Sequence, residues 1–226
     1  MSKERDYIDK IEGAERRYFV TPVTVEKRAE EGEEEKPAEI EGYAAVFNKR
    51  ADLFWFEEEI LPGAFDDVLN DDVRCLFNHN PNKILARSKD GKGTLTLSVD
   101  EKGLKYSYIT PDISYARDLQ TSIELGDVSQ SSFAFQASEV IWHDATDEND
   151  KELRQIKKIS KIYDVSPVTF PAYEDAEVGK RSFEQHKEQR KNDNKSSEEK
   201  QEEENKRASR SLDVFRAQLI VNQNRY

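Results

Sequence analysis

A serine-rich stretch, Gly126–Phe135, contains a candidate catalytic nucleophile. The residues after its glycine have the pattern of a β-strand, in which successive side chains point to opposite faces of a sheet. Phe133 and Phe135 mark one face as the core side, and Ser131 shares that face. Ser132 lies on the other face and is predicted to point away from the core into open space. A hydroxyl held in this way on a rigid strand suits nucleophilic attack.

A serine nucleophile needs a base that takes its proton, and usually a third group that orients the base. Of the three histidines, His79 follows a predicted strand, and its asparagine and proline neighbours would hold the imidazole at the edge of the core. His186 lies in a polar tail, where we expect no catalysis. For the third group the residues leave three alternatives open: Asp164 at a strand end, His143 before an acidic loop, and Glu124.

Other chemistries lack their usual sequence patterns. The serines do not have the flanking glycines of a G-x-S-x-G turn, which disfavours an α/β-hydrolase. The chain has no glycine-rich phosphate loop and no Cys/His spacing typical of a metal site, so we predict neither a cofactor nor a metal. Cys75 alternates with Val73 and Phe77 on a predicted strand, and we interpret it as a small buried hydrophobe rather than a catalytic thiol.

The composition restricts the classes of partner. The 226 residues carry a formal net charge of -12, which argues against nucleic acid as a partner. No apolar run approaches the roughly 20 residues that cross a bilayer, and the N-terminal residues lack the apolar core of a signal peptide. We therefore expect no membrane partner. The single cysteine excludes an intrachain disulfide and fits a reducing compartment.

The elements that must position these residues are mostly short strands. A helix is predicted over residues 113–125, and it ends at Gly126 because glycine tolerates the left-handed conformation of a helix end. A short helical turn is expected after Pro62. Many short strands with turn signals between them favour a closed or sandwiched β architecture with one main helix. Strand patterns occur over residues 18–25, 40–47, 73–77, 94–99, 104–109, 131–137, 140–142 and 154–163.

The distribution of charge divides the chain into three regions. Residues 1–17 form a charged N-terminal extension that we interpret as a mobile lead-in, and residues 18–182 form the compact domain. Residues 183–226 begin with a charged linker that has too few apolar residues to form a core. The helical spacing of Leu212, Phe215 and Leu219 predicts an amphipathic C-terminal helix after this linker. This helix would either dock on a partner or pack back on the domain.

Five sequence blocks resemble, in the same order, those of the prohead maturation proteases of tailed bacteriophages, whose fold is similar to that of the herpesvirus assemblins. The resemblance covers residues 18–182 and makes this region a prohead serine protease domain. It implies an α+β fold that is mainly β. The strands of this fold, about seven in number, would form a closed or partly closed barrel like that of the herpesvirus proteases. One main helix, one or more short helices and a polar helical C-terminal tail would complete it. The blocks are Ile40–Asn48, Glu59–Phe65, Phe77–Asn80, Gly126–Phe135 and Asp164–Tyr173.

The resemblance also implies catalytic roles. In that family the histidine after the strand and the serine before Phe-x-Phe form the catalytic pair, which by position are His79 as base and Ser132 as nucleophile. The acidic residue that opens the last block, Asp164, would orient His79. Because the related viral enzymes use a second histidine as third member, His143 stays the alternative. Two positions depart from the family, which usually has Met and Gly where this chain has Ser131 and Ala134.

The function that the resemblance implies is that of a serine endopeptidase without a cofactor. Such an enzyme would cleave the scaffolding segment of the major capsid protein precursor, and itself, as a dimer or multimer inside the assembling procapsid in the host cytoplasm. We place self-cleavage or a packaging signal in the polar tail from Glu184. Two alternatives stay open: a non-catalytic capsid assembly or scaffolding protein with the same fold, and a general cytoplasmic serine hydrolase that turns over small esters.

Overall fold

The computed structural model describes residues 7–19, 22–26, 38–147, 150–170, 180, 182–193, 195 and 200. The chain divides into two compact units, Met1–Gly179 and Lys180–Tyr226. In the second unit residues 182–193 are helical, and the predicted amphipathic helix around Leu212 lies outside the described residues. No helix in the described ranges is both long and apolar enough to cross a bilayer.

The first unit is mainly β, as its segments rich in β-branched and aromatic residues predict. Its described residues form twelve strands, one α-helix and one short 3-10 helix. In chain order the elements are η1 (Ile8–Lys10), β1 (Glu15–Phe19), β2 (Thr24–Glu26), β3 (Glu39–Val46), β4 (Ala51–Asp52), β5 (Glu57–Ile60), β6 (Val73–Leu76), β7 (Ile84–Lys89), β8 (Lys92–Gly93), β9 (Leu95–Val99), β10 (Gly103–Ile109), α1 (Ser114–Glu124), β11 (Gln130–His143) and β12 (Leu153–Val168).

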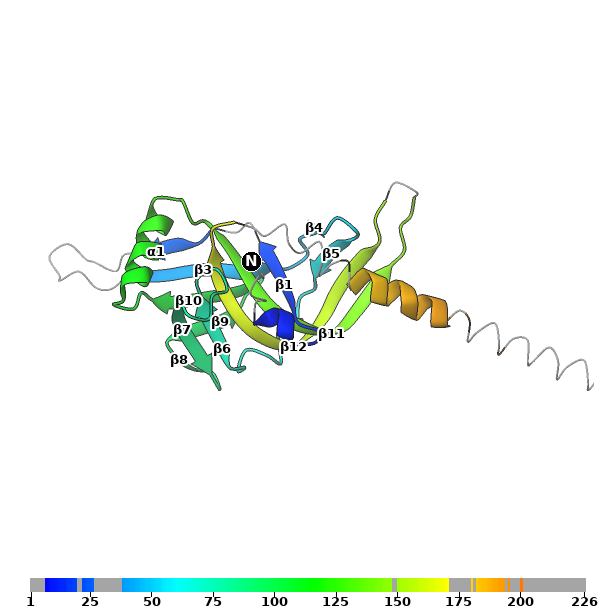
Figure 1. Ribbon diagram of the computed structural model, residues 1–226, viewed down its shortest axis with the longest axis horizontal. Helices are drawn as coiled ribbons and strands as arrows, with labels where there is room; N and C mark the ends of the chain where they lie inside the picture. The colour runs from blue at the N-terminus through cyan, green and yellow to red at the C-terminus, as the bar shows by residue number, and fades with distance from the viewer. Residues whose placement is uncertain are drawn as a thin grey trace, which may run out of the picture. The chain divides into compact units, whose positions relative to one another are not determined.

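The strands form two sheets (Figure 1). In the eight-stranded sheet the order is β1-β11-β12-β6-β7-β8, with β5 added beside β12 and β4 beside β5. In the four-stranded sheet the order is β2-β3-β10-β9. The hairpin predicted from residues 94–99 and 104–109 is confirmed as the antiparallel pair of β9 and β10.

A closed barrel, one of the two forms predicted, is wrong for the part of the chain that the structure describes, and its strands number twelve rather than about seven. Neither sheet shares a strand with the other, so their hydrogen-bonded edges do not join. β1 and β2 follow one another closely in the chain, yet β1 pairs with β11 and β2 pairs with β3. Residue patterns predict strands and their buried faces, whereas closure depends on which edges meet. The strand count exceeds the prediction because pieces as short as β4 form only through tertiary pairing.

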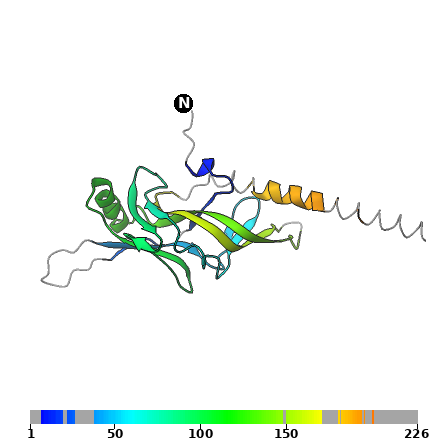
Figure 2. The same ribbon diagram turned by 90° about the horizontal axis from the view of Figure 1, so that it is seen from below.

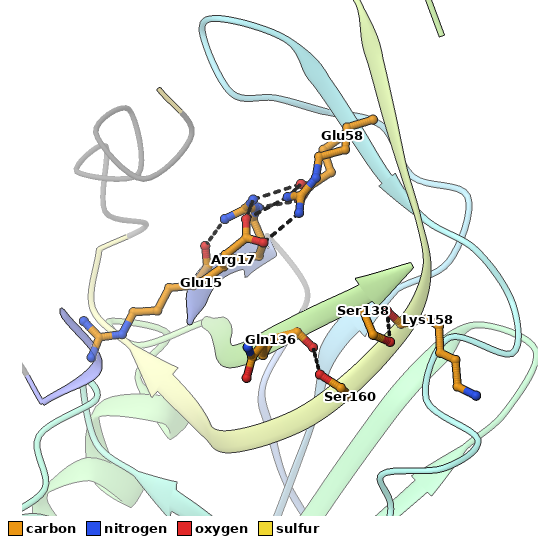
Figure 3. Close-up of polar contacts among 9 residues, drawn as sticks. Glu15, Arg17, Glu58, Gln136, Ser138, Lys158 and Ser160 are labelled. Atoms are coloured by element: carbon orange, nitrogen blue, oxygen red, sulfur yellow. Dashed lines mark hydrogen bonds and ion pairs between the residues drawn. The ribbon is translucent and has the colours of Figure 1, made fainter. Parts of the chain in front are cut away.

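β11 and β12 form one long antiparallel hairpin, which Figures 1 and 2 show as two long curved ribbons. The residue patterns predicted two separate strands where β11 runs without interruption. Bulges around Ala137 absorb the break in the alternation of side chains, so the strand continues past it. Side chains also link the two strands (Figure 3): Ser138 Oγ donates to the Lys158 carbonyl oxygen at 3.4 Å, and Ser160 Oγ donates to that of Gln136 at 3.2 Å.

β12 is paired along both of its edges. One edge bonds to β11, and the other bonds in parallel to β5 at its start and to β6 at Asp164 and Val165. Backbone groups buried in a sheet need such partners, because an unpaired buried N–H or C=O costs free energy comparable to a lost hydrogen bond. β12 therefore holds three segments that are far apart in the sequence.

The core lies between the apolar faces of the two sheets. Phe133 and Phe135 stack with 4.5 Å between their ring centroids, and Phe133 meets Phe65 edge-on at 5.8 Å. Tyr106 of β10 is fully buried against β11 from the other sheet. The prediction that Phe133 and Phe135 mark the core face is confirmed, as is the prediction that Cys75 is buried. Burial of each large apolar side chain contributes about 1.5–3 kcal/mol.

The predicted helix over residues 113–125 is present as α1, one residue shorter at each end. Gly126 follows it with a φ of 82°, in the left-handed region that glycine adopts without steric cost. The Asp127 amide then donates to the Ser122 carbonyl oxygen at 2.9 Å, which satisfies a carbonyl group at the helix end. The helix buries one face against the core through Ala116, Leu119 and Ile123.

Residues 7–17 are ordered as the short helix η1 and the start of β1, which corrects the prediction of a mobile lead-in for this described part of residues 1–17. β1 begins at Glu15 and pairs with β11, and Ile8 before it is only 3% exposed. The prediction followed the high charge of this region, because charged residues are usually solvated. The structure differs because the charges of β1 find partners on other strands.

Four charged side chains from three strands are buried together (Figure 3). Arg17 Nη2 lies 2.6 Å from Glu15 Oε2 and 2.8 Å from Glu58 Oε2, and Arg154 binds both carboxylates at 2.6 to 2.7 Å. Burial alone would raise the pKa of Glu15, but the charges of Arg17 and Arg154 outweigh it and lower that pKa from 4.5 to about 2. This ion cluster ties β1 to β5 and β12.

We predict that Glu15→Gln lowers the free energy of unfolding by about 3 kcal/mol at pH 7, because it leaves two buried guanidinium groups with one carboxylate. The pKa of Glu15 is lower in the folded than in the unfolded chain. Its contribution is therefore complete above about pH 4.5 and disappears as the pH falls through about 2. Urea unfolding at several pH values measures the difference from the unsubstituted chain.

Asp67→Asn is the control, since Asp67 is 66% exposed in its pair with Lys158 and solvent screens such a surface pair, so its loss should have little effect. Equal losses of unfolding free energy in the two variants would contradict the prediction. So would a difference between Glu15→Gln and the unsubstituted chain that stays the same as the pH falls.

Candidate active site

Three of the residues singled out from the sequence meet in the first unit. His79 Nε2 lies 2.5 Å from Ser132 Oγ, and His79 Nδ1 lies 2.6 Å from Asp164 Oδ1. The imidazole thus stands between a hydroxyl and a carboxylate, with one ring nitrogen toward each. This arrangement can move a proton from the hydroxyl to the ring while the carboxylate stabilises the charge that forms.

The strands that carry the three residues are neighbours in the eight-stranded sheet. β11 pairs with β12 so that Ser132 lies opposite Ser166 and Ala134 lies opposite Asp164. Directly opposite residues of an antiparallel pair share a face, and so do residues two apart on a strand. Ser132, Asp164 and Ser166 therefore project from the same face. β6 lies on the other edge of β12, and His79 comes just after it.

His79 occupies a tight turn that its neighbour Asn78 attaches to β12. The φ angles of Asn78 and His79 are 54° and 55°, and the Asn80 amide donates to the Phe77 carbonyl oxygen at 3.1 Å. Two consecutive positive φ angles with this bond define a type I′ turn, for which asparagine is well suited. Two further bonds fix the turn: the Asn78 amide donates to the carbonyl oxygen of β12 residue 167 at 3.1 Å, and Asn78 Oδ1 accepts from the amide of residue 169 at 2.9 Å.

Asp164 is fully buried, and three side chains donate to its carboxylate. Oδ1 accepts from His79 Nδ1 and, at 2.9 Å, from Ser166 Oγ, while Oδ2 accepts from the Tyr7 hydroxyl. Burial alone would raise the pKa of Asp164, but the charge of His79 and the hydrogen bonds from His79 and Tyr7 lower it below its usual value. The carboxyl group is therefore ionised at neutral pH.

Ser132 is completely buried, which corrects the expectation that it faces open space. The physical reason is that β1 pairs with β11 at this point, with residue 18 opposite Ser132. The Arg17 carbonyl oxygen of β1 lies 3.0 Å from Ser132 Oγ. Because a hydroxyl has a single proton, Ser132 donates either to this carbonyl or to His79 Nε2.

Solvent does not reach the three groups. Ser132 and Asp164 are 0% exposed, and His79 is 3% exposed. Tyr7, which precedes β1, contacts Asp164, and Arg17 of β1 contacts Ser132.

The other candidate residues lie away from this site. His143 is exposed at the far end of β11, where its Nε2 lies 2.7 Å from Gln155 Oε1. Glu124 is exposed on α1 and accepts from Gln120. Burial raises the pKa of the Cys75 thiol well above its usual value, which opposes formation of a thiolate. The described part of the chain contains no group of three or more His, Cys, Asp or Glu residues that could hold a metal ion.

The two departures from the family pattern both lie inside the protein. Ser131 is on the face opposite Ser132, and its Oγ lies 2.9 Å from the Tyr106 hydroxyl, so it packs toward the four-stranded sheet. Ala134 is fully buried opposite Asp164.

Residue patterns missed two side chains around the site, Ser166 and Tyr7, and described a third only in part. Ser166 shares the period of two with Asp164, so alternation along the strand was a signal that could have found it. The asparagine neighbours of His79 were expected to help hold the imidazole, but the bonds of Asn78 to residues 167 and 169 were not foreseen. Tyr7 had no signal, because its contact with Asp164 joins two distant parts of the chain.

We predict that Asn78→Gly lowers the free energy of unfolding by about 1 kcal/mol, because it removes the side-chain acceptor but keeps the freedom to adopt positive φ. Asn78→Ala should cost about 1–2 kcal/mol more, since its β-carbon opposes the left-handed conformation. Asn78→Asp retains an acceptor and stays close to the unsubstituted chain. Urea unfolding ranks the variants, and equal losses for Gly and Ala would contradict the turn geometry.

The chain was compared with solved structures, curated sequences and family models. A solved structure, that of the bacteriophage T4 capsid assembly protease gp21, matches with 12% sequence identity, a TM-score of 0.45, and coverage of 69% of this chain and 96% of that chain. No curated protein sequence matches significantly. A model of the Caudovirus prohead serine protease family, Peptidase_S78, matches residues 23–189. Because that match spans most of the chain, this protein belongs to the Caudovirus prohead serine protease family.

Proposed function

We propose that this protein is a serine endopeptidase that cleaves the scaffolding segment of a major capsid protein precursor, and itself, inside the procapsid. One observation carries the proposal: the continuous hydrogen-bonded line from Ser132 Oγ through the His79 ring to Asp164 Oδ1, with distances of 2.5 and 2.6 Å. Membership of the prohead serine protease family supports the reaction class and the capsid proteins as the class of substrate.

In the proposed reaction, Ser132 Oγ attacks the carbonyl carbon of the peptide bond while its proton passes to His79 Nε2. The tetrahedral intermediate collapses, the C–N bond breaks, and the leaving amine takes the proton from His79. Water then attacks the acyl ester with His79 again as base, which releases the second product and restores the Ser132 hydroxyl. Proton transfer by a positioned base accelerates such steps by about 10²–10⁴-fold.

Asp164 has the proposed role of orienting and stabilising the imidazole. With the carboxylate ionised, the tautomer of neutral His79 that fits carries its proton on Nδ1 and leaves Nε2 free to accept from Ser132. The same carboxylate then stabilises the positive imidazolium after proton transfer. The lowered pKa of Asp164 supports this role, because it keeps the negative charge in place at neutral pH.

We predict that Ser132→Ala, co-expressed with a capsid protein precursor, abolishes trimming of that precursor and of the chain itself, because no nucleophile is left. Ser129→Ala is the matched control, since Ser129 belongs to the same stretch but is exposed and outside the hydrogen-bonded line. Masses of the purified proteins over time report both cleavages.

Labelling by a fluorophosphonate, which reacts with activated serines, separates the proposal from its alternatives. If the precursor is still trimmed in Ser132→Ala, the assignment of Ser132 as the nucleophile is wrong. An unlabelled, untrimmed chain in the presence of capsid protein would favour the non-catalytic assembly protein. Turnover of small esters without trimming of the precursor would favour the general hydrolase.

We predict that Asp164→Asn lowers kcat/KM by about 10³–10⁴-fold, because an amide stabilises the wrong tautomer of His79 and carries no charge. His143→Gln should leave kcat/KM unchanged, since His143 is exposed and binds Gln155 rather than His79. Steady-state hydrolysis of a peptide from the trimmed junction compares the two. If Asp164→Asn leaves kcat/KM unchanged while His143→Gln abolishes activity, His143 and not Asp164 is the residue that orients His79.

A further inference from the structure

Ser166 is a buried hydroxyl beside the catalytic line that the proposed reaction does not use. It lies on β12 two residues after Asp164 and directly opposite Ser132 on β11, so it projects from the same face as both. Its side chain is 0% exposed. A buried hydroxyl is retained only with hydrogen-bond partners, because leaving it unpaired costs free energy.

The contacts of Ser166 join the acid to the base. Its Oγ donates to Asp164 Oδ1 at 2.9 Å and lies 3.3 Å from His79 Nδ1. The acceptor Oδ1 is the same oxygen that binds Nδ1 at 2.6 Å. Ser166 Oγ, Asp164 Oδ1 and His79 Nδ1 therefore form a triangle of close contacts, on the side of the imidazole that faces away from Ser132.

The geometry excludes Ser166 as a second nucleophile. The nitrogen nearest to it, Nδ1, carries the proton that binds Asp164, so it cannot take the proton of Ser166. The free nitrogen, Nε2, faces Ser132 at 2.5 Å. What Ser166 can do is donate its own proton to the carboxylate and limit rotation of that group.

We propose that Ser166 is a positioning residue, whose hydroxyl holds Asp164 Oδ1 against His79 Nδ1 and so keeps Nε2 directed at Ser132. The inference rests on the proposed function of this site. A carboxylate turns about the bond to its β-carbon, and each oxygen is fixed by its own donor: Ser166 and His79 bind Oδ1, and Tyr7 binds Oδ2. Loss of the Ser166 donor leaves Oδ1 with the imidazole alone, and although Tyr7 still holds Oδ2, the position of Oδ1 against Nδ1 is then less restricted.

The test compares Ser166→Ala with Ser160→Ala. Ser160 is the matched control because it lies on β12 and its hydroxyl also donates to a hydrogen bond, but it is exposed and bonds to the main chain of residue 136. We expect Ser166→Ala to lower kcat by about 10- to 100-fold, the range that follows from one hydrogen bond to a charged group, while KM stays unchanged. Ser160→Ala should match the unsubstituted enzyme in both constants.

A spectroscopic readout tests the position of the proton without any substrate. The Nδ1 proton of His79 is identified in the proton NMR spectrum by its absence from His79→Gln. In Ser166→Ala that resonance should shift and exchange faster with solvent, and in Ser160→Ala it should stay in place. A change of stability alone would not move this resonance in the folded protein.

The outcomes separate the inference from the proposed function. If Ser132→Ala retains activity, Ser132 is not the nucleophile and the proposed site fails, whatever Ser166→Ala does. If Ser132→Ala is inactive while Ser166→Ala keeps the kcat and the Nδ1 resonance of the unsubstituted enzyme, the inference about Ser166 is overturned and the proposed function stands.

Discussion

The pairing of β12 along both of its edges is the constraint on which the candidate site depends. Asp164 lies on this strand, Ser132 comes from β11 on one edge, and His79 follows β6 on the other edge. A shift of the β11 register by one residue would turn Ser132 to the opposite face and bring Ser131 in its place. The core prevents such a shift, because it would also turn Phe133 and Phe135 away from the apolar side chains that they contact.

Buried charge is the second constraint, and the protein satisfies it in two ways. Glu15 and Glu58 are balanced by the guanidinium groups of Arg17 and Arg154, so the ion cluster has no net charge and ties β1 to β5 and β12. Among the residues that the structure describes, Asp164 is held by hydrogen bonds from Tyr7, His79 and Ser166, and the Arg16 guanidinium acts on it through its charge. The negative charge of a carboxylate held in this way is not fully neutralised by its donors. It therefore attracts a positive imidazolium and stabilises that form of the ring. The ion cluster is thus fixed by paired charges, whereas the Asp164 carboxylate is fixed by hydrogen bonds, one of them from the His79 ring.

β1 connects the stability of the sheet to access to the site. Its Arg17 side chain belongs to the ion cluster, while its carbonyl oxygen contacts Ser132. The same strand therefore contacts Ser132 and is held by buried ion pairs, and breaking such a pair costs about 3–5 kcal/mol. Movement of the residues before β1, which carry Tyr7, requires none of these ion pairs to break.

The sequence by itself determined the local properties and the family. Alternation separated Ser132 from Ser131, helical spacing and Gly126 located α1, and the ordered blocks identified the prohead serine proteases. Only the tertiary structure decided that Ser132 is covered by β1, that the strands form two sheets without a closed barrel, and that Asp164 rather than His143 meets His79. The reason is physical: periodicity and capping depend on residues a few positions apart, whereas these features depend on which edges and charges meet from distant segments. The contact of Tyr7 with Asp164 joins the two ends of the first unit, and no local pattern could predict it.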